Sequence, residues 1–211
     1  MADLAQVAKA IDEGDREKTV QLTEELLKAG TSPTEIIAKG LQAGMGAVGE
    51  KFSSGEYFLP DMLMAARAMK AALELLKPAL EKTGIPTIGK VVIGTVEGDM
   101  HDIGKNVVAT FLSGNGFEVL DLGLNVPAQK FIDEVKAKQP DIVGMSALLT
   151  TTMPVMGKVI KALEENGLRA KVKVVVGGAP VTQDYANYIG ADGYAHDGGR
   201  AVPVCRQLLG K

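Results

Sequence analysis

The sequence predicts an α/β protein in which a bundle of four helices precedes a sheet of five parallel strands. Two observations lead to this fold class. From residue 4 to about residue 80, apolar residues recur every three or four positions, which is the spacing of amphipathic helices. From residue 89 onward, short β-branched segments alternate with helical ones, and such strand–helix units are typical of a parallel sheet covered on both faces.

Stripes of apolar residues predict the helices of the first half, and glycines follow the first two. The stripes run over residues 4–11, 20–27, 36–52 and 60–76. The third helix is expected to begin with a capping box, because Ser32 and Glu35 have the spacing at which each side chain bonds the other's backbone amide. The fourth is expected to end at Pro78, since proline lacks the amide that an interior helix residue donates.

A segment without periodicity separates the two halves. Residues 81–88 contain the run EKTGIPT, whose composition indicates a linker between an N-terminal domain, 1–80, and a C-terminal domain, 89–211. The strand candidates that follow are residues 91–95, 118–122, 142–146, 173–176 and 193–195. The helix candidates between and after them are residues 103–112, 128–138, 155–166, 183–189 and 201–209. Right-handed crossovers would order the strands 2-1-3-4-5, the doubly wound arrangement of flavodoxin-like domains.

Composition excludes several classes of protein. A net charge of −3 offers no basic surface for nucleic acid. Cys205 has no second cysteine with which to form a disulfide, which fits a reducing compartment, and we expect it in the core rather than at a metal. No apolar run reaches the length of a membrane span, and the first residues carry acids where a secretory signal is cationic. We therefore expect a cytoplasmic protein without nucleic-acid or membrane partners.

A histidine lies in the first loop at the carboxyl end of the expected sheet. His101 follows the first strand candidate and stands between Asp99 and Asp102, with Gly98 and Gly104 on either side. Ligands of such folds bind where the carboxyl ends of the strands meet. A carboxylate commonly holds the second ring nitrogen of a metal-bound histidine. His101 is thus a candidate metal ligand, and a solvated loop histidine is the alternative that this short motif leaves open.

Two further loops are expected at the same edge of the sheet. The third strand candidate ends at Ser146 and is followed by small and hydroxyl residues through Thr152. The fourth is followed by Gly177 and Gly178, where the absence of side chains lets a large group approach the backbone. Helix capping and a tight turn would explain each feature alone. Together with His101 they indicate a binding crevice.

Three motifs resemble those of cobalamin-binding domains in which a protein histidine replaces the cofactor's own base at cobalt, a state called base-off/His-on. They are Asp99-x-His101-x-x-Gly104, Ser146-x-Leu148 and Gly177-Gly178, separated by 41 and 28 residues. Residues 56–60, EYFLP, precede a helix rich in Met and Ala. There the chain is similar to the helical cap of cobalamin-dependent methionine synthase and of small corrinoid methyl-carrier proteins, so the resemblance covers nearly the whole chain.

The resemblance implies cobalamin, as methylcobalamin or cob(I)alamin, or another corrinoid as the cofactor, with His101 as the metal ligand. It implies that Asp99 and Ser146 form a proton-linked network with His101, and that these three residues have the catalytic role. The cofactor-binding residues that it implies in the α/β half are Gly98, Asp99, Met100, His101, Asp102, Ile103, Gly104, Ser146, Leu148, Thr150, Gly177, Gly178, Tyr194 and Ala195. His196 is expected near the nucleotide tail and away from cobalt.

From the helical half, the resemblance implies an apolar lid over the upper face of cobalt. Phe58, Met62 and Met69 are the residues expected to form it, because they recur on one face of the fourth helix. A methionine stripe is more commonly ordinary bundle core, which stays open as the alternative.

The function that the resemblance implies is methyl carriage. The chain would receive a methyl group from a substrate-specific methyltransferase and pass it to a second methyltransferase, with tetrahydrofolate or a thiol as the acceptor. It would be inactive alone, and a corrinoid reductive activase is a further expected partner. The alternatives are a cobalamin-dependent sensor and the small subunit of an adenosylcobalamin mutase. The methyl donor stays open among a methylamine, methanol, a methoxylated aromatic and a betaine.

Overall fold

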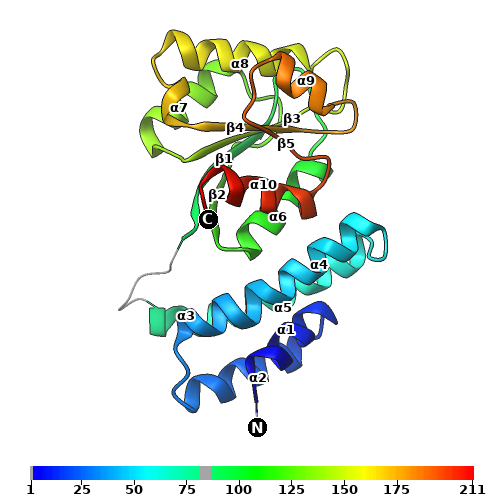
Figure 1. Ribbon diagram of the computed structural model, residues 1–211, viewed down its shortest axis with the longest axis vertical. Helices are drawn as coiled ribbons and strands as arrows, with labels where there is room; N and C mark the ends of the chain where they lie inside the picture. The colour runs from blue at the N-terminus through cyan, green and yellow to red at the C-terminus, as the bar shows by residue number, and fades with distance from the viewer. Residues whose placement is uncertain (1, 81–86) are drawn as a thin grey trace. The chain divides into compact units, whose positions relative to one another are not determined.

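The computed structural model describes residues 2–80 and 87–211, which group into two compact units (Figure 1). Residues 2–80 and Thr87 form the helical unit together with Gly114–Gly116, and the chain from Ile88 onward otherwise forms the α/β unit. Residues 81–86, most of the segment interpreted as a linker, lie outside the described residues. Among the described residues, no helix combines the length and the apolar character that crossing a membrane requires.

The helical unit consists of amphipathic helices whose apolar faces pack together. They are α1 (Leu4–Asp12), α2 (Arg16–Lys28), one long helix that runs through α3 (Pro33–Glu35), the π-helical segment η1 (Ile36–Leu41) and α4 (Gln42–Ser54), and α5 (Leu59–Leu80). α1 begins with a capping box that the sequence analysis missed, since the carboxylate of Asp3 accepts a 2.7 Å hydrogen bond from the amide of Gln6. The side chain of Gln6 accepts from the amide of Asp3 in return, at 3.3 Å.

Two predictions about helix ends are wrong. Ser32 is the N-cap residue before Pro33, but its hydroxyl pairs with that of Thr34 at 2.8 Å and bonds no backbone amide, so the expected capping box is absent. Pro78 does not end α5, which continues to Leu80. Proline removes one backbone hydrogen bond from the last turn, and the burial of Leu80 holds that turn in place.

The two methionines expected to form a lid are buried. Met62 is 0% exposed and Met69 is 3% exposed, and the helix that carries them, α5, packs against α2 and α4. Phe58, at the start of the same helix, is 67% exposed. The burial of Met62 and Met69 favours the bundle-core alternative, while a cofactor contact for Phe58, Met62 and Met69 stays a prediction.

Met62→Ala and Met69→Ala should each lower the free energy of unfolding of the cofactor-free protein by about 2–5 kcal/mol, because each removes buried methylene groups and leaves a cavity. Phe58→Ala is the matched control and should change it by less than about 0.5 kcal/mol, since the ring is exposed. Urea denaturation of the three variants measures these differences. Equal losses at all three positions would contradict the assignment of the two methionines to the core.

The α/β unit confirms the predicted doubly wound sheet. Its strands are β1 (Gly89–Thr95), β2 (Phe117–Asp121), β3 (Ile142–Ser146), β4 (Lys173–Gly177) and β5 (Gly193–Tyr194). They pair in parallel in the order β2-β1-β3-β4-β5. Three of them, β1, β3 and β4, are rich in β-branched residues and mostly buried, as strands covered on both faces of a parallel sheet require.

Helices cover the two faces of this sheet. They are α6 (Ile103–Gly114), α7 (Ala128–Lys138), α8 (Pro154–Glu165), the 3₁₀ turn η2 (Arg169–Lys171), α9 (Gln183–Tyr188) and α10 (Gly198–Leu208). α7, α8 and α9 share one core with the sheet, while α6 and α10 cover the opposite face (Figure 1). The register pairs Thr95 with Ser146 and Ser146 with Gly177, so β1, β3 and β4 end at the same level. The loops that follow these strands therefore lie side by side.

Candidate functional site

The loop between β1 and α6 is built around the buried carboxylate of Asp99. Its Oδ1 accepts hydrogen bonds from the ring Nδ1 of His101 at 2.7 Å and from the amide of the same residue at 3.1 Å. Its Oδ2 accepts from the hydroxyl of Thr152 at 2.7 Å. The amides of Leu148 and Leu149 also donate to Oδ2, at 2.8 and 3.2 Å. One carboxylate thus joins the loop after β1 to the loop after β3.

These donors keep Asp99 ionised. Burial alone would raise the pKa of Asp99, but the hydrogen bonds from Thr152, His101 and the backbone amides outweigh it and hold the pKa well below its usual value. An ionised Asp99 accepts the proton on Nδ1 of His101. The ring is therefore held as the tautomer in which Nε2 carries the free lone pair.

His101 presents that nitrogen to the outside of the α/β unit. Its side chain is 49% exposed, and its backbone oxygen accepts a 3.0 Å hydrogen bond from the hydroxyl of Thr95, the last residue of β1. Across residues 2–80 and 87–211, no hydrogen bond reaches Nε2. The ring is fixed on its inner side and open on its outer side, as a metal ligand needs to be.

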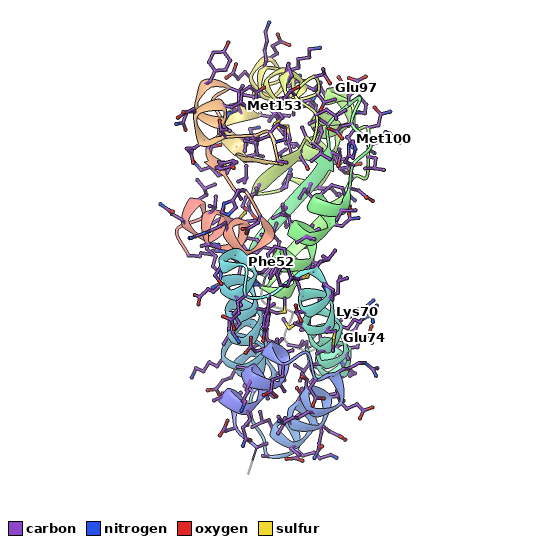
Figure 2. All side chains as sticks on the ribbon, turned by 90° about the vertical axis from the view of Figure 1, so that its right-hand side faces the viewer. Phe52, Lys70, Glu74, Glu97, Met100 and Met153 are labelled. Atoms are coloured by element: carbon purple, nitrogen blue, oxygen red, sulfur yellow. The ribbon has the colours of Figure 1, made fainter. Side chains whose placement is uncertain are left out.

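Large apolar side chains are exposed on the two loops that Asp99 joins. Met100 and Ile103 flank His101 in the sequence, and Leu148 and Leu149 come from the loop that bonds Asp99; all four are exposed. Figure 2 shows Met100 and Glu97 projecting outward from the loop after β1. Exposed apolar groups gathered around one polar atom are typical of a binding surface for a large, mostly apolar ligand.

The two glycines of the His101 loop have different reasons to be glycine. Gly98 has a φ of +84°, a conformation that side chains disfavour. Gly104 lies in the first turn of α6 with an ordinary φ, and a Cβ there would meet no atom within 4 Å. Neither packing nor backbone strain requires glycine at this position, so the space beside it is available to a ligand.

The glycine pair after β4 is required by its neighbours in the sheet. A Cβ on Gly178 would lie 1.9 Å from the carbonyl oxygen of Ala147, and one on Gly177 would lie 2.5 Å from that of Ala195. Close contact between backbones is therefore sufficient to explain both glycines. That they also make room for a nucleotide tail stays a prediction.

The hydroxyl that partners Asp99 belongs to Thr152, and the expectation that it would be Ser146 is wrong. Ser146 ends β3, where its backbone oxygen accepts a 3.0 Å hydrogen bond from the amide of Val96. Thr152 is buried in the turn before α8. The row of threonines from Thr150 was the signal available in the sequence, but only the turn of the loop decides which of them faces the carboxylate.

The remaining residues predicted for the site lie at the same edge of the sheet, but their side chains form no hydrogen bond with Asp99 or His101 in the described residues. Asp102 accepts a 3.0 Å hydrogen bond from the side chain of Asn106 within the first turn of α6. Thr150 is exposed on the loop after β3. Tyr194, the last residue of β5, is partly buried, and Ala195, which follows it, is buried. His196 follows them and pairs through Nε2 with Asp197 at 2.8 Å. The described residues contain no group of three or more His, Cys, Asp and Glu side chains that would hold a bare metal ion.

Comparison with protein families shows which cofactor this protein binds. Residues 89–204 match a family described as a B12 binding domain, and residues 4–77 match a second family of the same description. The chain belongs to the B12-binding corrinoid proteins. The resemblance drawn from the sequence is thereby confirmed, and a corrinoid is the cofactor of this protein.

Individual corrinoid proteins resemble the chain along its whole length. Trimethylamine corrinoid protein 1 of Methanosarcina acetivorans is 46% identical over 98% of this chain and 96% of its own. The crystal structure of a cobalamin-binding protein from Desulfitobacterium hafniense DCB-2 matches with a TM-score of 0.86 and 38% identity, covering 99% of both chains. A chain of the methanol:cobalamin methyltransferase complex of Methanosarcina barkeri matches with a TM-score of 0.83 and 35% identity, over 98% of this chain and 79% of that one.

Thr152→Val should lower the free energy of unfolding at pH 7 by about 1.5–3 kcal/mol, because it removes a hydrogen bond to a buried charge without changing the side chain's shape. Thr152→Ser keeps the hydroxyl donor and should lower the free energy of unfolding by less than Thr152→Val does. Ser146→Ala, the control, should cost less than about 0.5 kcal/mol. Urea denaturation compares the three, and a loss at Ser146 as large as that of Thr152→Val would reverse the assignment.

Thr152→Val should also weaken the pH dependence of stability. The pKa of Asp99 is lower in the folded than in the unfolded protein, so its ionisation stabilises the fold above the usual value of 3.8. That stability is lost as the pH falls through the folded pKa. Without the bond from Thr152 the folded pKa moves back toward 3.8, so urea midpoints measured between about pH 5 and 2 should fall less than in the wild type.

Proposed function

We propose that this protein carries a methyl group between two methyltransferases, with its corrinoid bound base-off and Nε2 of His101 as the lower ligand of cobalt. The pairing of His101 with Asp99 is the observation that carries the proposal. It leaves one nitrogen with a free lone pair facing outward from a fixed ring. A corrinoid supplies the four equatorial ligands of its cobalt, so one protein nitrogen is sufficient on that face.

The residues around His101 fit such a group. Met100, Ile103, Leu148 and Leu149 offer exposed apolar surface for the underside of a macrocycle. The open space beside Gly104 would otherwise be filled by a side chain at the start of α6. We place the nucleotide tail along the ends of β3 and β4, past Ser146, because the register brings these strand ends level with that of β1.

The chemistry of accepting and donating a methyl group at cobalt belongs to the bound corrinoid. The chain's own residues orient and tune it. Asp99, kept ionised by its donors, holds the proton on Nδ1 and stabilises the positive charge that imidazole gains when Nε2 donates its lone pair. When Nε2 is not bound to metal it can accept a proton instead. Ligation and protonation thus compete for one atom, which links the two.

The methyl donor that we propose is a methylamine, delivered by a substrate-specific methyltransferase. The similarity to a trimethylamine corrinoid protein along nearly the whole chain supports this choice. Methanol is the competing donor, because the chain also resembles a protein from a methanol:cobalamin methyltransferase complex. A second methyltransferase, with a thiol or tetrahydrofolate as acceptor, and a reductive activase complete the proposed set of partners, all in the cytoplasm.

His101→Ala should abolish nitrogen ligation of cobalt in protein reconstituted with cobalamin, while circular dichroism shows an unchanged fold because the ring is half exposed. The absorption spectrum distinguishes ligated from unligated corrinoid. His196→Ala is the matched control, since His196 is also exposed and also pairs with an aspartate, and it should retain the wild-type spectrum. An unligated spectrum for the wild type, or a ligated one for His101→Ala, would refute the proposed ligand.

Reduced cobalamin-loaded protein should become methylated when it is mixed with trimethylamine and a trimethylamine methyltransferase, and should stay unmethylated with methanol and a methanol-specific methyltransferase. The change of absorption on methylation measures both reactions. Methylation by the methanol system alone would replace the proposed donor but keep the carrier role. Methylation by neither system would count against methyl carriage itself.

A further inference from the structure

Lys105 carries a charge that the site as described does not use. Its side chain is 1% exposed, although it lies in the first turn of α6. Burial and a position at the amino end of a helix both disfavour a charged lysine. Burial removes the water around the ammonium group, and the amino end of a helix repels positive charge. A buried lysine at such a place requires close partners.

Two side chains supply them. The ammonium group forms an ion pair with the carboxylate of Asp121, the last residue of β2, and donates a 2.7 Å hydrogen bond to the side-chain oxygen of Asn106. Asp121 is 40% exposed, so the pair lies at the edge of the sheet with the lysine on the inner side. The first turn of α6 is thereby fixed to the end of the strand beside β1.

Both partners of Lys105, Asp121 and Asn106, are connected to His101 through further hydrogen bonds. On one side, the amide group of Asn106 donates to the carboxylate of Asp102, the residue after His101, at 3.0 Å. On the other, the carboxylate of Asp121 accepts from the amide of Gly123 at 2.9 Å. The oxygen of Gly123 accepts from the amide of Thr95 at 3.0 Å, and the hydroxyl of Thr95 donates to the backbone oxygen of His101. The hydrogen bonds close a ring around the base of the loop.

We infer that Lys105 is a positioning residue for His101: its ion pair with Asp121 completes this ring and holds the loop where Asp99 can accept from the imidazole. The inference rests on the proposed role of His101 as the ligand of cobalt. Asp99 fixes the ring from the side of β3, and Lys105 fixes the backbone from the side of β2. Without Lys105, the segment from His101 to Asn106 would keep its hydrogen bonds to Asp99 and Thr95 but lose its attachment to the end of β2.

The test uses full-length protein reconstituted with cob(II)alamin, whose electron paramagnetic resonance reports an axial nitrogen. Lys105→Met keeps the length of the side chain and leaves Asp121 free to be solvated. The ratio of nitrogen-ligated to unligated cobalt should fall by roughly tenfold, the change that about 1.4 kcal/mol brings to an equilibrium. Asp121→Asn, which weakens the pair from the exposed side, should lower the ratio in the same direction and serves if Lys105→Met does not fold.

The matched control is Arg169→Met. Arg169 pairs with Asp192 at 2.9 Å in the same unit, but beside the start of β4 at the opposite edge of the sheet. The Arg169→Met variant should lose thermal stability without any change in nitrogen ligation, whereas Lys105→Met should change the ligation itself. A wild-type resonance in both Lys105→Met and Asp121→Asn would overturn the inference, as would an equal change in Arg169→Met. If His101→Ala itself keeps the nitrogen signal, the proposed function fails instead.

Discussion

The site depends on one buried carboxylate. Asp99 is fully buried yet ionised. Water is replaced by five donors from two loops: the imidazole and amide of His101 in the loop after β1, and the amides of Leu148 and Leu149 and the hydroxyl of Thr152 in the loop after β3. Because burying an unpaired charge costs much free energy, the removal of any one of these donors should destabilise the folded protein. The orientation of the imidazole, the path of two loops and the turn before α8 all follow from this arrangement.

The fold was predictable because its evidence is repeated along the chain. Each β-branched run, such as the one before Thr95, is followed by a helical pattern, and right-handed crossovers favour a doubly wound order of the kind that the sheet has. His101, Asp99 and Gly104 could be recognised from their spacing, since they lie within a few residues of one another. The buried stripe on α5 was also visible, but periodicity does not tell whether Met62 packs against a helix or a ligand.

What the sequence analysis missed depends on the path of individual loops. Thr152 and Ser146 are both hydroxyl residues after the same strand, and only the turn between them decides which faces Asp99. The role of Lys105 could not be predicted, because its ion pair joins α6 to the end of β2, 16 residues further along the chain. The close approach of Gly178 to the carbonyl oxygen of Ala147, in a neighbouring strand's loop, could not be predicted either, and the room that Gly178 leaves for a nucleotide tail stays a prediction.

The hydrogen bonds to Asp99 are complete in the protein chain alone, which has a kinetic consequence. An imidazole already held in one tautomer and one orientation needs no ordering when a ligand arrives, so the entropic cost of fixing the loop is met during folding rather than during binding. Corrinoid uptake by the α/β unit should then resemble the docking of a rigid surface. Because the loop is already ordered, the rate of cofactor capture does not depend on the slower steps of folding.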